Sequence, residues 1–346
     1  MAIWMNLTNP KSSQKLFNMA KISVIIPVYN RETLLRPCLE SLEKQTFHDF
    51  ELVFVDDCSS DKSRLVLQDF LNKNKKIQGS IYSTPKNSGV SAARNVGIAN
   101  STGEYIYFID SDDSLSENCL EKLYNLAYQK DLDIVIGENL IIGDTTKYVK
   151  SGINEEIVYG NSEILRLFTS GKWYNVVWNK LVKRAIVTEN QLFFKEGYIF
   201  EDELWTFSLA TKVNSLGVIH DATYFYKIGH VSIMTSNQKI KRWSRLLDIL
   251  PLMKEYILKE KLETNPYVSF FYLEKLAELT NAFFTERAMN YTLFKRIKSL
   301  SYIDMKLLLR NKHLSKGQYW GWLYFSLPNP LAYLYCTFLY RLIFRA

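Results

Sequence analysis

The chain has 346 residues, enough for one large α/β domain with a smaller appendage or for two ordinary domains. Its 47% hydrophobic and 23% charged residues, with 14 Gly and 8 Pro, exclude collagen-like, low-complexity and wholly disordered chains. The net charge is +7, but residues 237–346 hold 18 Lys and Arg against 8 Asp and Glu, and so carry +10 alone. Such a basic end indicates an anionic partner surface, either nucleic acid or the inner leaflet of a membrane.

The start of the chain and its cysteines indicate a reducing compartment. The four cysteines form no CxxC pair and lack the even spacing of a secreted, disulfide-bonded scaffold. Residues 1–20 contain neither an uninterrupted apolar stretch nor a small-residue cleavage site, which argues against a signal peptide. We therefore expect a poorly ordered leader at 1–20 and a cytoplasmic protein.

From residue 21 onward, short apolar runs alternate with helical patterns. Strands are predicted at 22–29, 51–55, 77–83, 104–109 and 133–137. Helices are predicted at 31–45, 62–73 and 90–99, and a capping box of Ser114 and Glu117 predicts another that ends near 130. This alternation predicts a mostly parallel sheet with helices on both faces and ligands at the carboxyl ends of its strands.

After residue 143 the regularity fades. Short helices are predicted at 162–168 and 201–212, extended segments at 192–199 and 217–228, and a helical pattern from about 239. We therefore expect three parts: the leader 1–20, an α/β domain over 21–235, and a C-terminal helical, basic and aromatic region over 236–346.

Residues 319–340 contain no charged side chain, so a membrane span has to be considered. Pro328 and Pro330 interrupt the segment near its middle, and Trp and Tyr rings fill it. Since Lys and Arg flank it, we favour an amphipathic hairpin on an anionic membrane surface. The alternative is a helix pair packed on the main domain or in a homodimer.

The densest group of carboxylates is DSDD at 110–113, directly after an apolar strand. If Asp110 and Asp112 stay extended, both carboxylates lie on one side, where they suit Mg²⁺ or Mn²⁺ and a diphosphate. The structural alternative is a capped turn. Dinucleotide, P-loop, zincin and nucleophile-elbow motifs are absent from the sequence.

Two further polar positions fall at strand ends or beside them. Asp56 follows the second strand, where it can accept from the N–H edge of a base; the alternative is a turn that caps the next helix. Arg94 lies in a helix of small residues and could approach a phosphate or pair with a surface carboxylate.

Four ordered blocks resemble glycosyltransferase family 2, the inverting nucleotide-sugar transferases of the GT-A fold. The blocks are VIIPVYNRE at 24–32, SLEKQTFHDFELVFVDDCSSD at 41–61, NSGVSAARNVGI at 87–98 and STGEYIYFIDSDD at 101–113. The resemblance covers roughly residues 21–235. It implies an α/β GT-A domain, Rossmann-like, followed by an all-helical region.

The resemblance also implies a donor site built after the first four strands. Asp56 would hold uracil, and Asp112 of the DxD motif would ligate Mn²⁺ or Mg²⁺, which would neutralise charge on the departing diphosphate. His230 would reach the metal or the diphosphate, although a lone His is more often not catalytic. The other expected nucleotide-sugar residues are Pro27, Tyr29, Asn30, Glu32, Arg94, Asp110 and Ser111.

The acceptor side is implied by two later segments. FEDELW at 200–205 matches the family's ED motif, so Asp202 is the expected base, followed by Glu201. The alternative is an acidic first turn, and a helix N-terminus would lower the pKa of such a carboxylate. Trp178, Asn179 and Lys180 match a WNK segment on the acceptor side, while Trp173 and Trp205 could stack on a sugar or belong to the core.

These features lead to a functional hypothesis. We expect a glycosyltransferase, most simply a hexosyltransferase, that moves one sugar from a UDP-sugar to a saccharide acceptor. That acceptor is expected to be lipid-linked, in capsule, exopolysaccharide or lipopolysaccharide synthesis at the inner face of the cell membrane, without nucleic acid as a partner. Two alternatives stay open: a nucleotidyltransferase, whose Gly-rich loop is absent from PVYNRE, and a non-catalytic membrane-associated nucleotide-sugar-binding protein.

Overall fold

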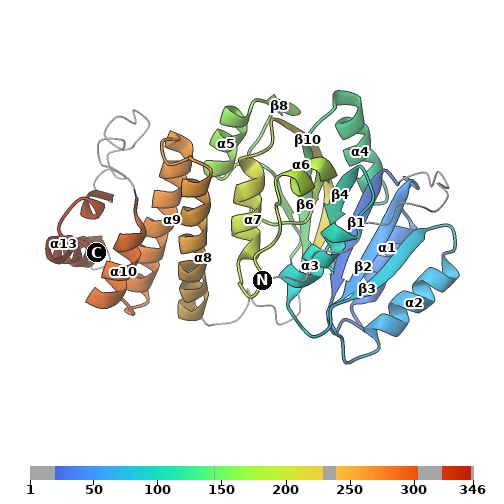
Figure 1. Cartoon of the computed structure of the whole chain (residues 1–346), viewed down its shortest axis with the longest axis horizontal. Helices are drawn as coiled ribbons and strands as arrows, with labels where there is room; N and C mark the ends of the chain where they lie inside the picture. Colours follow the sequence, from blue (N-terminus) through green and yellow to red (C-terminus); the bar gives the residue numbers. More distant parts are fainter. Residues whose placement is uncertain (1–19, 144, 229–238, 303–321, 344–346) are drawn as a thin grey trace, which may run out of the picture.

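The computed structural model describes residues 20–143, 145–228, 239–302 and 322–343. One ten-stranded mixed sheet forms its centre (Figure 1), with eight strands in the order β3-β2-β1-β4-β9-β6-β10-β5 and β7 and β8 paired to β6 and β10. The strands are β1 (Ile22–Val28), β2 (Phe50–Asp56), β3 (Gln78–Ser83), β4 (Tyr105–Phe108), β5 (Ser114–Leu115), β6 (Ile134–Ile142), β7 (Lys147–Val149), β8 (Ile157–Tyr159), β9 (Lys180–Lys183) and β10 (Ser215–Lys227).

The helices follow the strands as the alternating pattern predicts. They are α1 (Leu35–Glu43), α2 (Ser63–Lys73), α3 (Val90–Ala99), α4 (Cys119–Lys130), α5 (Asn161–Thr169), α6 (Arg184–Glu189), α7 (Glu201–Ala210), α8 (Lys239–Lys259), α9 (Pro266–Thr285), α10 (Tyr291–Leu300) and α13 (Asn329–Ile343), with a 3₁₀ turn, η1 (Leu323–Phe325). Strands β1 to β4 pair in parallel, as do β6 and β10, so the predicted mostly parallel α/β sheet is confirmed.

Two apolar cores cover opposite faces of the sheet. One core packs α1, α2 and α4 against alternate side chains of β1, β2 and β4. The other contains side chains of α3 and α5 to α10, and so runs without a break from the sheet into the C-terminal helices. Helices α8, α9, α10 and α13 extend in a row away from the sheet in Figure 1. The predicted helical C-terminal region is confirmed, and it shares a core with the α/β domain.

The predicted capping box before α4 is wrong. Ser114 lies in β5, where it pairs with Phe225 of β10, and α4 begins only at Cys119. The amide of Leu120 donates instead to Gln45 Oε1 at 3.1 Å. A side chain from another part of the chain thus satisfies the free N–H group that a local cap would have satisfied.

Other differences from the sequence expectations lie after residue 130. Strand β6 is longer than the predicted 133–137 because β7, β9 and β10 all pair with it. Residues 192–199 form no strand, while the extended segment at 217–228 is confirmed as most of β10. The short strand β9 and helix α6 carry no clear periodicity of their own and were not predicted.

The aromatic end of the chain packs on α9 and α10. Trp322 and Tyr324 are buried, and Ala332 and Cys336 of α13 join Tyr324 and Phe294 in a small core. Among the helices of the described ranges, none combines the length and hydropathy that a membrane crossing requires. None of the described residues covers one side of α13, where Leu331, Leu334 and Phe338 are exposed.

Candidate active site

The polar positions predicted from the sequence gather at the carboxyl ends of the parallel strands. Asp56 is the last residue of β2 and pairs in register with Val28 of β1, while Asp110 follows β4 on the other side of β1. Strand β9 runs antiparallel to β4 and β6, so its first residue, Lys180, lies at the same edge. Donor-side and acceptor-side segments therefore meet at one edge of the sheet.

The loops after β1 and β2 are joined by side-chain hydrogen bonds. Asn30, with a left-handed φ of 50°, accepts from the amide of Ser60 at 2.8 Å, and Glu32 accepts from the amide of Lys62 at 3.1 Å. Tyr29 is 42% exposed, whereas Pro27 is buried within β1. Of the expected nucleotide-sugar residues that follow or end β1, Tyr29, Asn30 and Glu32 thus lie in one interlocked pair of loops, and Pro27 lies within the strand before it.

The two adjacent carboxylates at the end of β2 have different environments. Asp57 accepts from the Thr84 hydroxyl at 2.6 Å and from the amides of Ser88 and Gly89 at 2.9 and 2.7 Å, and so anchors the loop that precedes α3. Asp56 is buried and accepts from the amide of Ser59 at 3.3 Å. Asp57 therefore has a structural role, and Asp56 remains the candidate for a base contact.

The DSDD motif is held from three directions. Asp110 pairs with Arg94 at 3.0 Å, and Asp112 lies 3.5 Å from Nε of Arg31. The carboxylate of Asp113 accepts from the Tyr224 hydroxyl at 2.6 Å and from the Lys227 amide at 3.0 Å. Burial, together with the charge of Asp110, raises the pKa of Asp113 to about 8.

Arg94 joins the two predicted motifs of the site. Its side chain is buried, with Nη2 on Asp110 and Nη1 on Glu201 at 2.8 Å, while the ring of Phe194 lies 5.3 Å from the guanidinium carbon. Of the two alternatives for Arg94, the pairing with carboxylates is the one observed, although these carboxylates belong to the motifs and not to the surface. Its Nε and the nearby Ser91 Oγ are buried without a hydrogen-bond partner among the described residues.

Asp202 lies in the first turn of α7 between two other carboxylates. Its Oδ1 accepts from the amide of Glu203 at 3.0 Å. Burial, followed by the charges of Glu201 and Glu203, raises its pKa to about 7. The expected lowering by the helix N-terminus is therefore wrong, because desolvation and like charges outweigh the helix dipole. A carboxylate with such a pKa is well matched to proton transfer near neutral pH.

Two of the three predicted acceptor-side residues, Asn179 and Lys180, are buried and have different roles. Asn179, with φ of 56°, is a buried hub: it donates to Glu138 O and Asn139 Oδ1 and accepts from the hydroxyls of Tyr107 and Thr223. Lys180 is buried, donates to the carbonyl of Val176, and has its pKa lowered to about 7 by burial, against the opposing charge of Asp202. Lys180 is thus the member of the segment whose charge interacts with that of Asp202.

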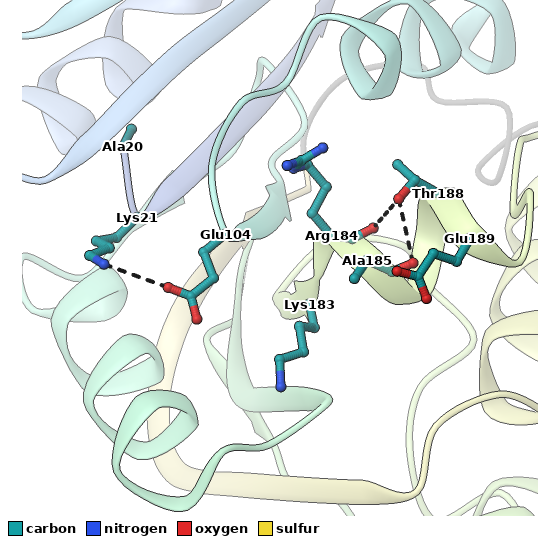
Figure 2. Close-up of a pocket in the computed structure, with 8 residues that line it drawn as sticks. All are labelled: Ala20, Lys21, Glu104, Lys183, Arg184, Ala185, Thr188 and Glu189. Carbon is teal, nitrogen blue, oxygen red and sulfur yellow. Dashed lines mark hydrogen bonds and ion pairs between the residues drawn. The ribbon is translucent and has the colours of Figure 1, made fainter. Parts of the chain in front are cut away.

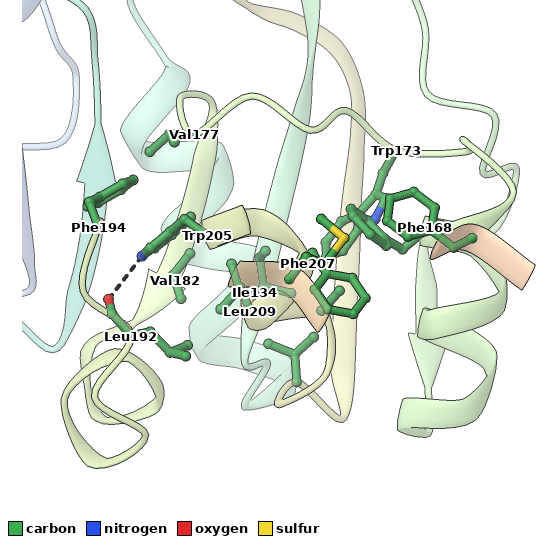
Figure 3. Close-up of a cluster of buried hydrophobic side chains, with 14 of the residues drawn as sticks. Ile134, Phe168, Trp173, Val177, Val182, Leu192, Phe194, Trp205, Phe207 and Leu209 are labelled. Carbon is green, nitrogen blue, oxygen red and sulfur yellow. Dashed lines mark hydrogen bonds between the residues drawn. The ribbon is translucent and has the colours of Figure 1, made fainter. Parts of the chain in front are cut away.

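The tryptophans divide in the same way. Trp205 is buried, its indole N–H donates to the carbonyl of Leu192 at 3.0 Å, and it stacks on Phe194 (Figure 3). Trp173 is also buried, edge-on to Phe168. Trp173 and Trp205 therefore belong to the hydrophobic core and are not placed to stack on a sugar. Trp178 is only partly buried and stacks on Tyr224 and Tyr226, with ring centroids 4.3 and 5.7 Å apart.

The residues of the site can be tested as ligands for the expected Mg²⁺ or Mn²⁺. Asp110 and Asp112 supply carboxylate oxygens, the ligand type that Mg²⁺ and Mn²⁺ take together with substrate phosphates. No group of three or more His, Cys, Asp or Glu side chains suited to a metal occurs in the part of the chain that the structure describes. The amide of Asp113 donates to the carbonyl of Asp110 at 3.1 Å, so the motif forms the turn and not the extended arrangement that would place both carboxylates on one side. Two carboxylates fit a cation only where a diphosphate supplies further oxygens. His230, the other predicted ligand, lies outside the described residues.

A separate cavity of about 490 Å³ lies at the opposite edge of the sheet. Its lining includes Ala20, Lys21 and Glu104, which precede β1 and β4, together with Arg184 and Glu189 of α6 (Figure 2). Lys21 and Glu104 form an ion pair at 3.7 Å. Because it lies at the amino ends of the parallel strands, this cavity is distinct from the candidate active site.

Two residues of the site were missed by sequence reasoning. Tyr224 donates to Asp113 and accepts from the amide of Asp110 at 3.2 Å, so it fixes both ends of the DSDD turn. Nothing in its own segment signals this role, which depends on the pairing of β10 with β5. Arg31 lies inside the block at 24–32, directly after the first predicted strand, and that position was the available signal; its contact with Asp112 exists only in the fold.

Comparisons with known proteins agree with this arrangement. The model of "Glycosyl transferase family 2" matches residues 23–190. Glycosyltransferase GlyG of Streptococcus pneumoniae serotype 4 is 30% identical over 248 residues, covering 68% of this chain and 79% of that protein. Poly(ribitol-phosphate) beta-N-acetylglucosaminyltransferase TarP of Staphylococcus aureus is 31% identical over 234 residues, covering 64% and 69%. The structure of S. aureus TarS 1-349 in complex with UDP-GlcNAc aligns with a TM-score of 0.58 at 22% identity over 81% and 83% of the two chains.

Proposed function

Because the chain belongs to glycosyl transferase family 2 and is a glycosyltransferase, we propose that it transfers one sugar, with inversion, from a UDP-sugar to a saccharide acceptor, with Asp202 as the base. The observation that carries this proposal is the double ion pair of Arg94, which holds the DSDD motif and the first turn of α7 together. The proposed base and the proposed donor site therefore share one buried charge network.

On the donor side, Asp56 would accept from the uracil N–H, while Tyr29 and the loops after β1 and β2 would enclose the nucleoside. The unpartnered Nε of Arg94 and Oγ of Ser91 are donors suited to diphosphate oxygens. TarS was solved with UDP-GlcNAc, which supports a UDP-sugar as the donor class. Which sugar the enzyme selects depends on a few hydrogen bonds within this site.

Asp112, with Asp110 beside it, would hold Mg²⁺ or Mn²⁺ against the diphosphate. When bound, the cation supplies neutralising charge to the departing nucleoside diphosphate. Asp112 lies 3.5 Å from Arg31 Nε in the present structure, so this carboxylate already faces a positive charge. Arg31 and the cation would together oppose the negative charge of the diphosphate.

The transfer balances as a direct displacement. The carboxylate of Asp202 takes the proton of an acceptor hydroxyl as that oxygen bonds to the anomeric carbon of the sugar. The bond from this carbon to the diphosphate oxygen breaks, and its electron pair leaves with UDP. Burial and the charges of Glu201 and Glu203 favour the protonated form of Asp202, whereas the positive charges of Arg94 and Lys180 favour its ionised form.

The acceptor is proposed to be a polysaccharide or teichoic-acid-type chain, since TarP acts on poly(ribitol phosphate). The exposed side of α13 supports a location at an anionic membrane surface, where a lipid-linked acceptor would lie. Leu331, Leu334 and Phe338 follow helical spacing on this side, and Lys295 and Arg296 of α10 are exposed on the neighbouring helix. An interface between two copies of the chain is the alternative for the same side.

The test is sugar transfer by Asp202→Asn. With a screened UDP-sugar, Mn²⁺ and an acceptor glycan, we expect transfer to fall at least about 10²-fold, the usual contribution of a general base, while the thermal shift caused by UDP with Mn²⁺ stays as in the parent protein. Full transfer by the variant would refute the assignment of the base. Nucleotide transfer to a sugar phosphate, in place of UDP release, would favour a nucleotidyltransferase.

A further inference from the structure

The proposed base has a carboxylate on each side of it in the first turn of α7, and each is held by a cation from a different part of the chain. Glu201 pairs with Arg94 of α3, in the α/β domain. Glu203 pairs with Lys275 of α9, in the C-terminal helical region, at 3.2 Å. The second cation lies outside every motif that the sequence analysis identified.

The contact around Glu203 is specific on both of its oxygens. Lys275 Nζ lies on Oε1, and Asn175 Nδ2 donates to Oε2 at 2.9 Å. The carbonyl of Asn175 in turn accepts from the Thr206 hydroxyl, one turn further along α7, at 2.9 Å. Glu203 and Lys275 are only 17% and 16% exposed. The link therefore joins α7, α9 and the segment that leads to Trp178 and Asn179.

This ion pair is not needed simply to attach α9. Phe271, Leu276 and Leu279 already bury α9 in the same apolar core as Phe207 and Leu209 of α7. A partly buried ion pair adds little net stability to such a contact, because desolvation offsets the Coulomb attraction. The position of the pair beside Asp202 is better explained by electrostatics: the positive charge of Lys275 neutralises that of Glu203, the residue next to Asp202.

We propose that Lys275 is a positioning residue for sugar transfer: it fixes Glu203 and neutralises its charge beside Asp202, which makes α9 part of the catalytic unit. The inference rests on the proposed role of Asp202 as the base. Lys275 itself touches neither substrate nor reacting atoms; it acts through Glu203.

The charges that face Asp202 come from three elements, and a fourth element faces Glu203. Glu201 and Glu203 lie on α7 itself, Arg94 on α3 and Lys180 on β9, while Lys275 of α9 faces Glu203. Loss of Lys275 leaves the charge of Glu203 uncompensated, which favours the protonated form of Asp202 and raises its pKa further. Replacing Glu203 by Gln removes a like charge and lowers that pKa.

The experiment measures kcat and KM against pH for full-length Lys275→Met, Lys275→Arg and Glu203→Gln. If Asp202 must be ionised to act as the base, kcat rises with pH, and the midpoint of the rise reports the pKa of Asp202. We expect the midpoint of this rise to move to higher pH in Lys275→Met by about half a unit or more, and to lower pH in Glu203→Gln. Lys275→Arg should keep the parent midpoint, and KM for the UDP-sugar should change little in all three variants.

Lys212→Met is the matched control. Lys212 pairs with Glu260 at 2.6 Å, is similarly exposed and also joins the end of α7 to the C-terminal helices, but it lies away from Asp202. This variant should keep the parent midpoint. Should Lys275→Met unfold, Lys275→Gln, which keeps a polar side chain at this position, takes its place: the midpoint should again move to higher pH, and an unmoved midpoint would overturn the inference.

The outcomes separate this inference from the proposed function. If Asp202→Asn is inactive and neither Lys275→Met nor Glu203→Gln moves the midpoint, the pair is purely structural and the inference is overturned. If Asp202→Asn transfers sugar normally, the proposed base is wrong and the inference falls with it. Equal shifts in Lys212→Met and Lys275→Met would also overturn the inference, since any link to the C-terminal helices would then have the same effect.

Discussion

Arg94 Nη1 lies 2.8 Å from Glu201 Oε1, although 107 residues separate the two in the sequence. The same guanidinium holds Asp110 through its other terminal nitrogen. A motif that follows β4 and a motif that opens α7 are therefore fixed relative to each other by one buried cation.

Arg94→Met should destabilise the protein strongly. The change leaves two carboxylates in a mostly buried setting without their cation, and breaking such a pair costs about 3–5 kcal/mol. Urea unfolding of the variant and the parent measures the loss in free energy of unfolding. Arg36→Met, which breaks the exposed pair with Glu40 in α1, should leave the unfolding midpoint unchanged. An equal effect of both changes would contradict the buried bridge.

Asp56→Asn and Asp57→Asn should give opposite results, although the two positions are adjacent. The first removes the proposed acceptor for uracil, so UDP binding measured by calorimetry should weaken about tenfold or more, with little change in stability. The second weakens three hydrogen bonds to the loop before α3, so the unfolding temperature should fall. Intact UDP binding in Asp56→Asn would remove Asp56 from the donor site.

Asp202→Asn should stabilise the protein at alkaline pH. The carboxyl titrates near 3.8 when unfolded and near 7 when folded, so its contribution to stability is full below about pH 3.8 and is lost as the pH rises through 7. The variant does not titrate, and so should gain about 1–3 kcal/mol over the parent at pH 8 and much less at pH 5.

Thermal unfolding at the two pH values measures this difference. Asp69→Asn on the exposed side of α2 is the control and should show no such dependence. A gain in Asp202→Asn that does not change between pH 5 and pH 8 would contradict the raised pKa of Asp202.

Tyr224→Phe should weaken metal-dependent activity while the fold is retained. The hydroxyl is the link between β10 and the DSDD turn, and its loss leaves the buried Asp113 with one fewer donor. We expect the Mn²⁺ concentration for half-maximal transfer to rise several-fold and the free energy of unfolding to fall by about 1–3 kcal/mol. Tyr159→Phe, at a ring that is exposed on β8 and pairs with the opposite end of β10, is the control and should leave the Mn²⁺ dependence as in the parent.

Leu334→Asp with Phe338→Asp should reduce binding to vesicles that contain an anionic lipid. Both side chains are at least 60% exposed on α13, and a charge there opposes insertion of that side into the interface. Co-sedimentation with phosphatidylglycerol vesicles measures the effect, and Leu65→Asp, at a site 58% exposed on α2, is the matched control. Unchanged sedimentation, with a smaller particle on gel filtration, would favour the interface between two copies.

The sequence was sufficient for the regular part of the molecule. Alternating apolar runs and helical patterns located β1 to β4 and α1 to α3 because each repeats one local period. Strands such as β5 and β9 were not predictable in this way. They contain two and four residues and exist because neighbouring strands supply partners for them.

The candidate site shows the same limit. Asp110, Asp112, Glu201 and Asp202 could be named from their motifs, since strand ends and helix starts are visible in the sequence. Their electrostatics could not, because the raised pKa of Asp202 depends on burial and on charges that the fold brings around it. Lys275 and Tyr224 lie in segments without a motif, and only tertiary contacts reveal them.

The strand order also sets the order in which the sheet can be completed during synthesis. Strand β9 lies between β4 and β6, so the open edge of β4 at Tyr105–Phe108 has no partner until Lys183 has left the ribosome. A nascent chain that stops before this point exposes an apolar strand edge, a recognised site of aggregation. Fragments for expression should therefore end after β10, since any earlier boundary leaves the centre of the sheet unfinished.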